Sequence, residues 1–337
     1  MKKHFGTLPS GQDAYLYTIK NDKIIACISD FGATLVNLWI PDKSGHYADV
    51  VLGHDCAGDY WGDTSCMGAT VGRNANRIAG ASLAIGDKVY KLPANDGKNS
   101  LHSLPDGYNQ RIWTVSEHSE DQIQFTLFSP HLDQGFPGNA FLYVTYAIES
   151  PATLTITYEA TCDADTIFNL TNHSFFNLAG HEKLDCALNQ HLIIKSPIFI
   201  PSDATSIPLG EERAVDGTPM DFRQGKRIGD DIDADDNCLK LQGGFDHTFC
   251  AEADPCAILS DPISGRTMSI RTDCPGVHFY SGNYLHGEPG KGGIQYPRRS
   301  GICLETHFYP DAVHNPQWKQ PFIPAGKRYR SKTSFIF

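Results

Sequence analysis

The stretch ATLTITYEAT, residues 152–161, decides the fold class of this chain. One face of this run carries Leu154, Ile156, Tyr158 and Ala160, and the other carries Thr153, Thr155, Thr157 and Glu159. Such alternation with a period of two is typical of a half-buried antiparallel strand. The preceding run FLYVTYAIE (141–149) alternates in the same way, and Glu-Ser-Pro at 149–151 has the composition of a turn. The two runs together predict a β-hairpin.

Short strand-like runs recur along the rest of the chain, separated by segments rich in Gly, Pro, Asn and Asp. They are KIIACIS (23–29), ATLVNLWIP (33–41), ADVVLG (48–53), QIQFTLFS (122–129), HLIIKSPIFI (191–200), RTMSIRT (266–272), GVHFYSGNYL (276–285), GICLETHFY (301–309) and SKTSFIF (331–337). Convincing amphipathic helices of ten or more residues are missing, and no linker or repeat divides the chain. The sequence therefore predicts an all-β protein, a large antiparallel β-sandwich, with residues 1–337 as one domain.

Composition restricts the partners. The 28 basic and 39 acidic residues give a net charge of −11, and no basic run appears, which argues against nucleic-acid and membrane partners. No apolar stretch reaches membrane-spanning length, and the start of the sequence lacks the apolar segment of a signal peptide. The ten cysteines form no CxxC pair, so we expect them to be reduced. Together these features predict a cytoplasmic protein.

The segment NLTNHSFFNLAG (169–180) allows two interpretations. Asn169 and Asn172 each begin a glycosylation sequon, which would place them on an exposed loop of a secreted protein. Alternatively, His173 lies on a half-buried strand and presents its imidazole to a ligand. A cytoplasmic chain does not meet the glycosylation machinery, so we favour the second interpretation, although a lone strand histidine is often only structural.

Glu305 is the most informative single residue. It interrupts the apolar run Ile302–Thr306, and Glu is rarely buried without a partner or a task. A buried Glu with a raised pKa is a candidate general base near neutral pH. If Glu305 is the base and His173 the acid, activity should follow a bell-shaped pH profile. Unperturbed pKa values of about 4.3 and 6.5 would place both limbs in the mildly acidic range.

Further polar residues are candidates for binding a polyhydroxy ligand. Arg77 offers a fork of donors and Asp246 a pair of acceptor oxygens, which together suit vicinal hydroxyl groups. The alternatives are a structural ion pair for Arg77 and a turn role for Asp246. Trp61, Phe279 and Trp318 are candidate apolar platforms for a sugar ring, but we expect at least two of them to be simply core residues.

A metal site is a further alternative. His102, His173 and Glu305 could in principle form a two-His-one-carboxylate face. The chain has no H-x-H or H-E-x-x-H spacing to support such a site. We therefore predict that no metal is bound.

Five ordered motifs resemble the aldose 1-epimerase (galactose mutarotase) family. They are GRNANRIAGA (72–81), NLTNHSFFNLAG (169–180), GGFDHTF (243–249), PGVHFYSGNYL (275–285) and GICLETHFYPDAVHNP (301–316), and the opening FGATLVNLWIPDKSGHYADVVLG (31–53) is also similar to that family. The resemblance covers nearly the whole chain. It implies a β-sandwich enzyme, an isomerase that interconverts the α and β anomers of free hexoses such as galactose and glucose, with no cofactor.

The resemblance also implies roles for individual residues. The general base of the family falls on Glu305, its general acid on His173 and its assisting histidine on His102. The residues that bind sugar hydroxyls fall on Asn76, Arg77 and Asp246.

Three positions depart from the family pattern. His278 stands where the family usually has a Gln that contacts the sugar, Ser103-Leu104 replaces Gly-Gly after His102, and His307 replaces a Gln. These departures keep a different hypothesis open, a sugar-binding protein of the same fold without turnover. They also leave the preferred sugar open.

A further hypothesis is a related epimerase that acts on a phosphorylated hexose. The cations available to bind the phosphate are Arg73, Arg77, Arg298 and Arg299. All three hypotheses imply a small-molecule sugar as the partner. The oligomeric state expected is a monomer or a homodimer.

Overall fold

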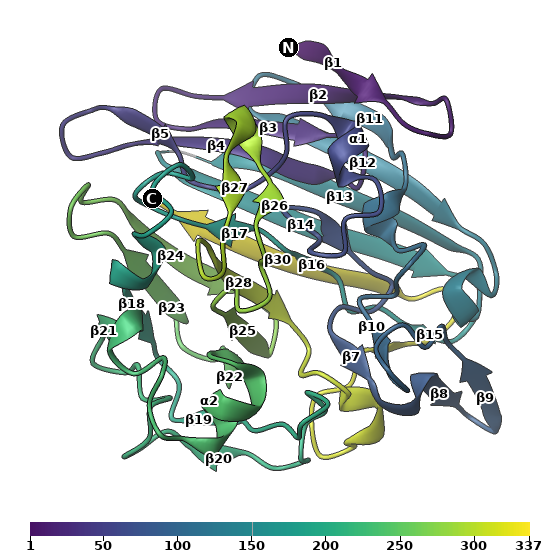
Figure 1. Cartoon of the computed structure of the whole chain (residues 1–337). Helices are drawn as coiled ribbons and strands as arrows, with labels where there is room; N and C mark the ends of the chain where they lie inside the picture. The colour runs from purple at the N-terminus through teal and green to yellow at the C-terminus, as the bar shows by residue number, and fades with distance from the viewer. Residues whose placement is uncertain (150) are drawn as a thin grey trace.

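The computed structural model describes residues 1–149 and 151–337, and it is built mainly of antiparallel strands (Figure 1). The predicted all-β class is therefore confirmed. The two runs of the predicted hairpin pair from Ala140↔Cys162 to Glu149↔Thr153. The turn expected at 149–151 includes residue 150, which lies outside the described residues.

The large sheet has nine strands within the described residues. In spatial order they are β11 (Thr114–His118), β12 (Gln122–Ser129), β13 (Ala140–Glu149), β14 (Thr153–Cys162), β30 (Arg328–Ile336), β24 (Thr267–Thr272), β23 (Ala257–Ser260), β18 (His191–Ile194) and β21 (Lys226–Arg227). The decisive stretch forms β14, and its apolar face (Leu154, Ile156, Tyr158, Ala160) is buried as the alternation predicts. β14 lies in the middle of the sheet, between β13 and β30.

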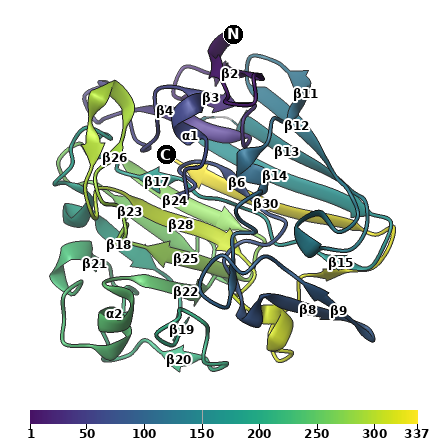
Figure 2. The same cartoon turned by 45° about the vertical axis from the view of Figure 1, so that its right-hand side comes forward.

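A second sheet, which we call the site sheet, packs against the large sheet (Figure 2). Its strands, in spatial order, are β17 (Phe175–Phe176), β28 (Ile302–His307), β25 (Gly276–Tyr280), β22 (Asp246–Cys250), β19 (Ile198–Ile200) and β20 (Arg213–Ala214). Phe176 on β17 contacts Phe335 on β30 with ring centroids 5.3 Å apart. The hydroxyls of Thr306 on β28 and Thr333 on β30 are also hydrogen-bonded. The two sheets thus enclose one continuous apolar core.

Smaller elements complete the fold. The N-terminal sheet contains β1 (Lys2–Thr7), β2 (Asp13–Lys20), β3 (Ile25–Ser29), β4 (Thr34–Pro41) and β5 (Tyr47–Asp49). Two-stranded pairs are β6 (Thr70–Val71) with β16 (Thr171–Asn172), β7 (Arg77–Ile78) with β10 (Ser100–Leu101), β8 (Ser82–Ile85) with β9 (Lys88–Lys91), β15 (Thr166–Ile167) with β29 (Phe322–Ile323), and β26 (Glu288–Pro289) with β27 (Gln295–Tyr296).

The helices are short. They are α1 (Ala57–Tyr60) and α2 (Asn237–Gln242), with 3₁₀ turns at Ala79–Ala81, Tyr108–Gln110, Asp133–Gly135, Ala187–Asn189, Ile228–Asp230, Lys291–Gly293 and Ala312–His314. Among residues 1–149 and 151–337, no helix has the length and apolar character needed to cross a membrane.

The β26–β27 hairpin is fixed to the N-terminal sheet by a buried ion pair. The Nζ atom of Lys291 lies 2.6 Å from Oδ2 of Asp49 and donates to the carbonyl oxygens of Val36 and Val51. All its donors are thereby used. Since Glu288 begins this hairpin, the anchor also sets the position of one wall of the cavity described below.

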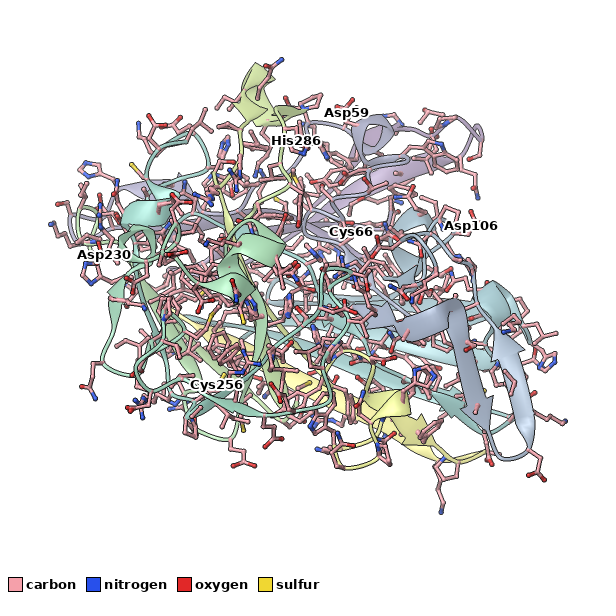
Figure 3. The ribbon with its side chains drawn as sticks, turned by 60° about the horizontal axis from the view of Figure 1, so that its bottom comes forward. Asp59, Cys66, Asp106, Asp230, Cys256 and His286 are labelled. Carbon is pink, nitrogen blue, oxygen red and sulfur yellow. The ribbon has the colours of Figure 1, made fainter. Side chains whose placement is uncertain are left out.

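The cysteines behave as predicted. All ten are free thiols in the part of the chain that the structure describes, and most are buried. Figure 3 places Cys66 and Cys256 among packed side chains, whereas the labelled carboxylates Asp59, Asp106 and Asp230 are exposed.

Candidate active site

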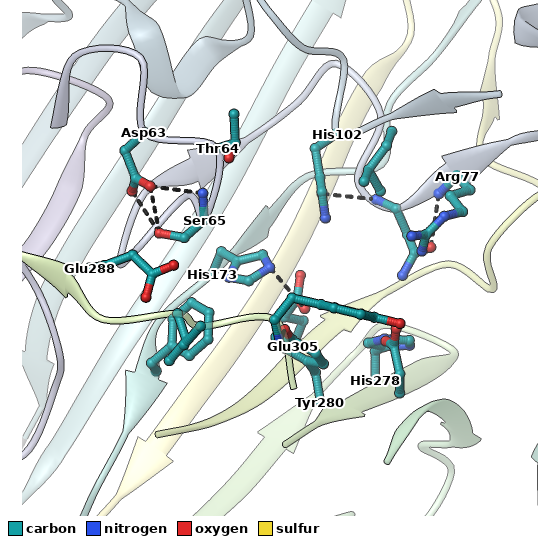
Figure 4. Close-up of a pocket in the computed structure, with 16 residues that line it drawn as sticks. Asp63, Thr64, Ser65, Arg77, His102, His173, His278, Tyr280, Glu288 and Glu305 are labelled. Atoms are coloured by element: carbon teal, nitrogen blue, oxygen red, sulfur yellow. Dashed lines mark hydrogen bonds and ion pairs between the residues drawn. The ribbon is translucent and has the colours of Figure 1, made fainter. Parts of the chain in front are cut away.

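A cavity of about 260 Å³ opens over the site sheet (Figure 4). All seven residues singled out from the sequence line it, namely Asn76, Arg77, His102, His173, Asp246, His278 and Glu305. The remaining lining residues are Asp63, Thr64, Ser65, Leu101, Phe175, Tyr280, Tyr284, Leu285 and Glu288. The seven predicted residues come from six separate parts of the sequence, and the fold brings them together.

The floor of the cavity includes His278 and Glu305, which belong to a row of side chains across three neighbouring strands. Thr248 on β22 lies opposite His278 on β25, which lies opposite Glu305 on β28. Directly opposed residues on adjacent strands point to the same face of a sheet. All of β28 is buried, and Glu305 has only 2% of its surface exposed. The apolar run in the sequence thus marked a buried carboxylate, as expected.

Glu305 and His173 face each other. The Nε2 atom of His173 lies 3.5 Å from Oε1 of Glu305, while Oε2 of Glu305 has no hydrogen-bond partner among the described protein atoms. His173 lies in the short connection between β16 and β17, where its N–H donates to the carbonyl oxygen of Ala69. Its Nδ1 atom is 3.7 Å from Sγ of Cys303. The orphaned Oε2 is therefore an acceptor available to a ligand.

His102 is held by Asn76 through two hydrogen bonds. The N–H of His102 donates to the carbonyl oxygen of Asn76, and the N–H of Asn76 donates to Nδ1 of His102, both at 3.2 Å. Both residues have left-handed backbone conformations, with φ of 60° and 55°. Because Nδ1 accepts a hydrogen bond, a neutral His102 must carry its proton on Nε2. It thus offers the cavity a hydrogen-bond donor.

Two glycines connect α2 to Asp246. Gly243 caps the C-terminus of α2 with φ of 66°, and Gly244 has φ of 146°, where a Cβ atom would lie 2.3 Å from Oδ1 of Asn283. Only glycine fits such a position, since it has no Cβ atom. The Gly-Gly pair thereby directs Asp246, at the start of β22, toward the cavity.

Asp246 is paired with His278. The Nε2 atom of His278 lies 2.7 Å from Oδ1 of Asp246, and its Nδ1 atom lies 2.8 Å from the hydroxyl of Thr248. Arg77 is paired too, because its Nε donates to Oδ2 of Asp96 at 2.7 Å. Both hydroxyl-binding candidates are therefore fixed in place before any ligand arrives.

Burial shifts the protonation of the central groups. Burial, reinforced by Asp246, raises the pKa of Glu305 well above its usual 4.5. Burial also lowers the pKa of His173 to about 4, and it lowers the pKa of His102 well below 6.5, with His173 adding to the effect. For Asp246, burial raises the pKa, but the hydrogen bond from His278 and the charges of His278 and Arg77 together outweigh burial, so the pKa is lower than usual. His102 is therefore neutral and Asp246 ionised at neutral pH.

His102, His173 and Glu305 meet the distance requirement for a metal site. One ligand atom each from His102, His173 and Glu305 lie within 4.8 Å of one another, which the sequence spacing did not indicate. A metal would need a lone pair on each imidazole nitrogen that faces it. With the Asn76 N–H on Nδ1, the neutral His102 presents an N–H instead. This tautomer favours a hydrogen-bond donor over a metal ligand.

The core alternative holds for two of the three aromatic candidates, and the cavity takes its apolar walls from other residues. Trp61 is 44% exposed, Phe279 and Trp318 are buried in the core, and none of them lines the cavity. Phe175 and Tyr280 form apolar walls instead, with ring centroids 5.9 Å apart. Phe175 begins β17 two residues after His173, and His173 itself lies in the connection between β16 and β17 rather than on the strand that the sequence predicted.

Two of the arginines considered for a phosphate lie elsewhere. Arg298 and Arg299 line a different surface pocket, where both donate to the carbonyl oxygen of Gly243 and Arg299 also pairs with Asp233. A third, Arg73, is fully buried and outside the cavity. Its guanidinium donates to Tyr108, Ser129, Thr166 and the carbonyl oxygen of Pro137. Of the four arginines, only Arg77 reaches the cavity.

The glycosylation interpretation is wrong. Asn169 and Asn172 are 2% and 8% exposed, and their side-chain amides donate to the carbonyl oxygens of Ala75 and Gly68. A buried amide that is already hydrogen-bonded cannot carry a glycan.

Comparisons with known proteins show the family of this chain. The family model described as aldose 1-epimerase matches residues 15–335. The galactose mutarotase of Sus scrofa is 37% identical over 99% of this chain and 97% of its own length. The aldose 1-epimerase of Escherichia coli (strain K12) is 35% identical over 98% and 96%. The crystal structure of galactose 1-epimerase from Lactobacillus acidophilus NCFM superposes with a TM-score of 0.87, at 26% identity, covering 100% of this chain and 97% of that one. The chain belongs to the aldose 1-epimerase family.

Proposed function

We propose that this aldose 1-epimerase interconverts the α and β anomers of free aldohexoses such as galactose and glucose, with Glu305 as general base and His173 as general acid. The observation that carries the proposal is the 3.5 Å approach of these two buried groups in a cavity of about 260 Å³. The geometry supports a ring-opening reaction, in which one proton leaves the anomeric hydroxyl and another arrives at the ring oxygen.

In the proposed mechanism a carboxylate oxygen of Glu305 takes the proton from the C1 hydroxyl. The C1–O5 bond breaks as C1=O forms, and the ring oxygen takes a proton from Nε2 of His173. The open-chain aldehyde rotates about its C1–C2 bond and closes from the opposite face, with Glu305 now the acid and His173 the base. The protons and electrons balance without an external reactant, so the proposal includes no metal and no cofactor.

The other polar residues are proposed to hold the sugar. Asp246 accepts hydrogen bonds from ring hydroxyls, while the free guanidinium nitrogens of Arg77 donate to them. Asn76 and His278 complete this end of the cavity. His102 is proposed to donate its Nε2–H to a reacting oxygen, as a neutral imidazole does when it polarises a substrate.

The chain as a whole is proposed to act as one domain, since the apolar core includes residues from Tyr17 to Phe335. A cytoplasmic location and a monomeric or homodimeric state remain part of the proposal. No specific observation favours the two alternative functions. The paired Asp246 and His278 suit neutral hydroxyls rather than a phosphate, and the facing acid and base candidates argue against a sugar-binding protein without turnover.

Polarimetry tests the proposal directly. Glu305→Gln removes the base with little change in shape, and loss of a general base typically costs on the order of 10² to 10⁴ in rate. We expect the variant to slow the catalysed decay of optical rotation of α-galactose by that factor. A variant near wild type would refute the assignment, and a wild-type protein that binds galactose in a calorimeter without any acceleration would favour the non-catalytic hypothesis.

A further inference from the structure

The cavity has a second polar end that the proposed catalytic mechanism does not use. Asp63, Ser65 and Glu288 line it, and Figure 4 shows them on one side of His173 with Arg77 and His278 on the other. Asp63 lies in the connection between α1 and β6, and Glu288 begins the β26–β27 hairpin. Nothing in the sequence-based analysis assigned a role to either carboxylate.

Asp63 is a fixed anion. Its carboxylate accepts hydrogen bonds from the N–H and the hydroxyl of Ser65 and lies 3.5 Å from Nε2 of His54. Burial raises the pKa of Asp63, but the hydrogen bonds from His54 and Ser65 outweigh burial and hold the pKa below the usual 3.8. The residue is therefore ionised whenever the enzyme works near neutral pH.

Glu288 is positioned by its own hairpin. One of its oxygens accepts the N–H of His286 at 2.7 Å, and the hairpin is anchored by Lys291 to Asp49. The Pro289 carbonyl oxygen contacts Nδ1 of His54 at 2.5 Å. His54 thus bridges the two acidic walls of the cavity, since its other ring nitrogen faces Asp63.

The charges of the cavity do not balance. Asp63, Asp246 and Glu288 line it besides Glu305, whose pKa is raised by burial, against Arg77 as the sole Lys or Arg among the described lining residues. Arg77 is itself paired with Asp96 at 2.7 Å, and Asp63 and Asp246 face the imidazoles of His54 and His278. Glu288 is therefore the acidic lining residue that no cation pairs among the described residues. A cavity lined by charges of one sign focuses the electric field, so the binding of an anionic ligand is electrostatically unfavourable there.

We propose that Asp63 and Glu288 act as specificity-determining residues that exclude anionic sugars, both sugar phosphates and uronates, and admit neutral sugars of the same shape. The inference rests on the proposed epimerase function of the same cavity. The acidic end repels a phosphate or carboxylate substituent on the ring, whereas a hydroxyl or an amide donates hydrogen bonds to the same oxygens.

Glucuronate and glucuronamide separate charge from shape, because they differ only in the replacement of a carboxylate by a carboxamide. At low ionic strength we expect kcat/KM of the wild-type enzyme for glucuronamide to be at least tenfold higher than kcat/KM for glucuronate. The quantity compared between variants is the ratio of these two values. Glu288→Gln and Asp63→Asn should each lower this ratio by roughly threefold to tenfold, as for the loss of one charge several ångströms away in a partly screened site. Added salt should shrink the wild-type ratio.

Glu120→Gln is the matched control, because it removes one exposed negative charge outside the cavity. It should leave the ratio unchanged. Asp63→Asn risks misfolding, since Asp63 holds the loop through Ser65, so Glu288→Gln is the decisive variant. A wild-type ratio near one, or an unchanged ratio in Glu288→Gln, would overturn the proposal. Failure of the epimerase function itself would show separately, as no acceleration with glucose or galactose.

Discussion

Nε2 of His173 and Oε1 of Glu305 lie 3.5 Å apart in a buried setting, so the two groups titrate as a pair. Burial raises the pKa of Glu305 and lowers that of His173 to about 4. Between about pH 4 and the raised pKa of Glu305, the unliganded pair therefore holds one proton, and that proton sits on Glu305. The mechanism needs the same number of protons, with the proton moved to His173. This differs from the sequence-based estimate, which used unperturbed values.

The first prediction is a broad pH profile of kcat/KM. Below about pH 4 the pair gains a second proton and loses its base, and above the raised pKa of Glu305 it loses its only proton and its acid. We expect a plateau between these limits, measured by polarimetry with the spontaneous rate subtracted. Glu305→Gln should abolish the alkaline limb in whatever activity remains. An alkaline limb that persists unchanged in that variant would assign it to another group.

The second prediction concerns His102 as a neutral donor. His102→Leu removes the Nε2–H and should lower kcat/KM on the order of 10², the usual cost of losing one such donor. Both pH limbs should stay where they are, because the pKa of His102 lies well below 6.5. Nitrogen-15 NMR of the imidazole provides a direct check of the tautomer. A proton found on Nδ1 of His102 would contradict the role derived from Asn76.

The third prediction is that metal removal has no effect. Nδ1 of His102 accepts the Asn76 N–H, so the neutral ring has no lone pair to offer the cavity. Prolonged dialysis against EDTA should leave the polarimetric rate unchanged. Lost activity that returns on adding Zn²⁺ would show that His102, His173 and Glu305 do bind a metal.

The fourth prediction separates two substitutions of His278. His278→Gln can still donate to the buried Asp246, whereas His278→Leu leaves that carboxylate without its 2.7 Å partner. Leaving a buried charge unpaired costs roughly 1–3 kcal/mol or more. We expect KM for galactose to rise roughly tenfold or more in His278→Leu and to change much less in His278→Gln. Equal effects of the two substitutions would mean that the hydrogen bond to Asp246 does not matter for binding.

The fifth prediction concerns stability. Lys291→Met leaves Asp49 buried without its cation, and breaking a buried pair in this way typically costs about 3–5 kcal/mol. Urea denaturation should show this loss in the free energy of unfolding. Lys183→Met is the control, since its pair with Glu182 is exposed and should contribute less than about 1 kcal/mol. Similar effects of the two substitutions would contradict the importance of the buried pair.

The sequence predicted the fold class and much of the site for identifiable reasons. β14 shows its burial directly, because a period of two assigns each side chain to one face. Glu305 stood out because a carboxylate inside an apolar run has few structural explanations. The roles assigned to His102 and Asn76 came from the family resemblance, and the two hydrogen bonds that join them needed the three-dimensional arrangement.

What the sequence left out depends on contacts between distant segments. Asp63 and Glu288 lie in a loop and a hairpin more than two hundred residues apart, and contacts such as those of His54 and Lys291 join the two segments at one cavity. Arg73 was a candidate phosphate ligand, yet its donors are used by groups that no local pattern indicates. The direction of the pKa shift in the Glu305–His173 pair likewise depends on burial, which local sequence does not quantify.

The pairing of β14 with β30 also bears on how quickly the protein folds. The hydroxyls of Thr155 and Ser334 meet at 3.1 Å although they are 179 residues apart. Chains dominated by such non-local pairs fold slowly, because the loop-closure entropy is lost before the contact stabilises the chain. The proposed acid and base, His173 and Glu305, also come from distant segments, so we expect the cavity to form only when the whole core has closed. After dilution from denaturant, activity should therefore return at the rate of the slowest spectroscopic phase of refolding, and no activity should return in the faster phases.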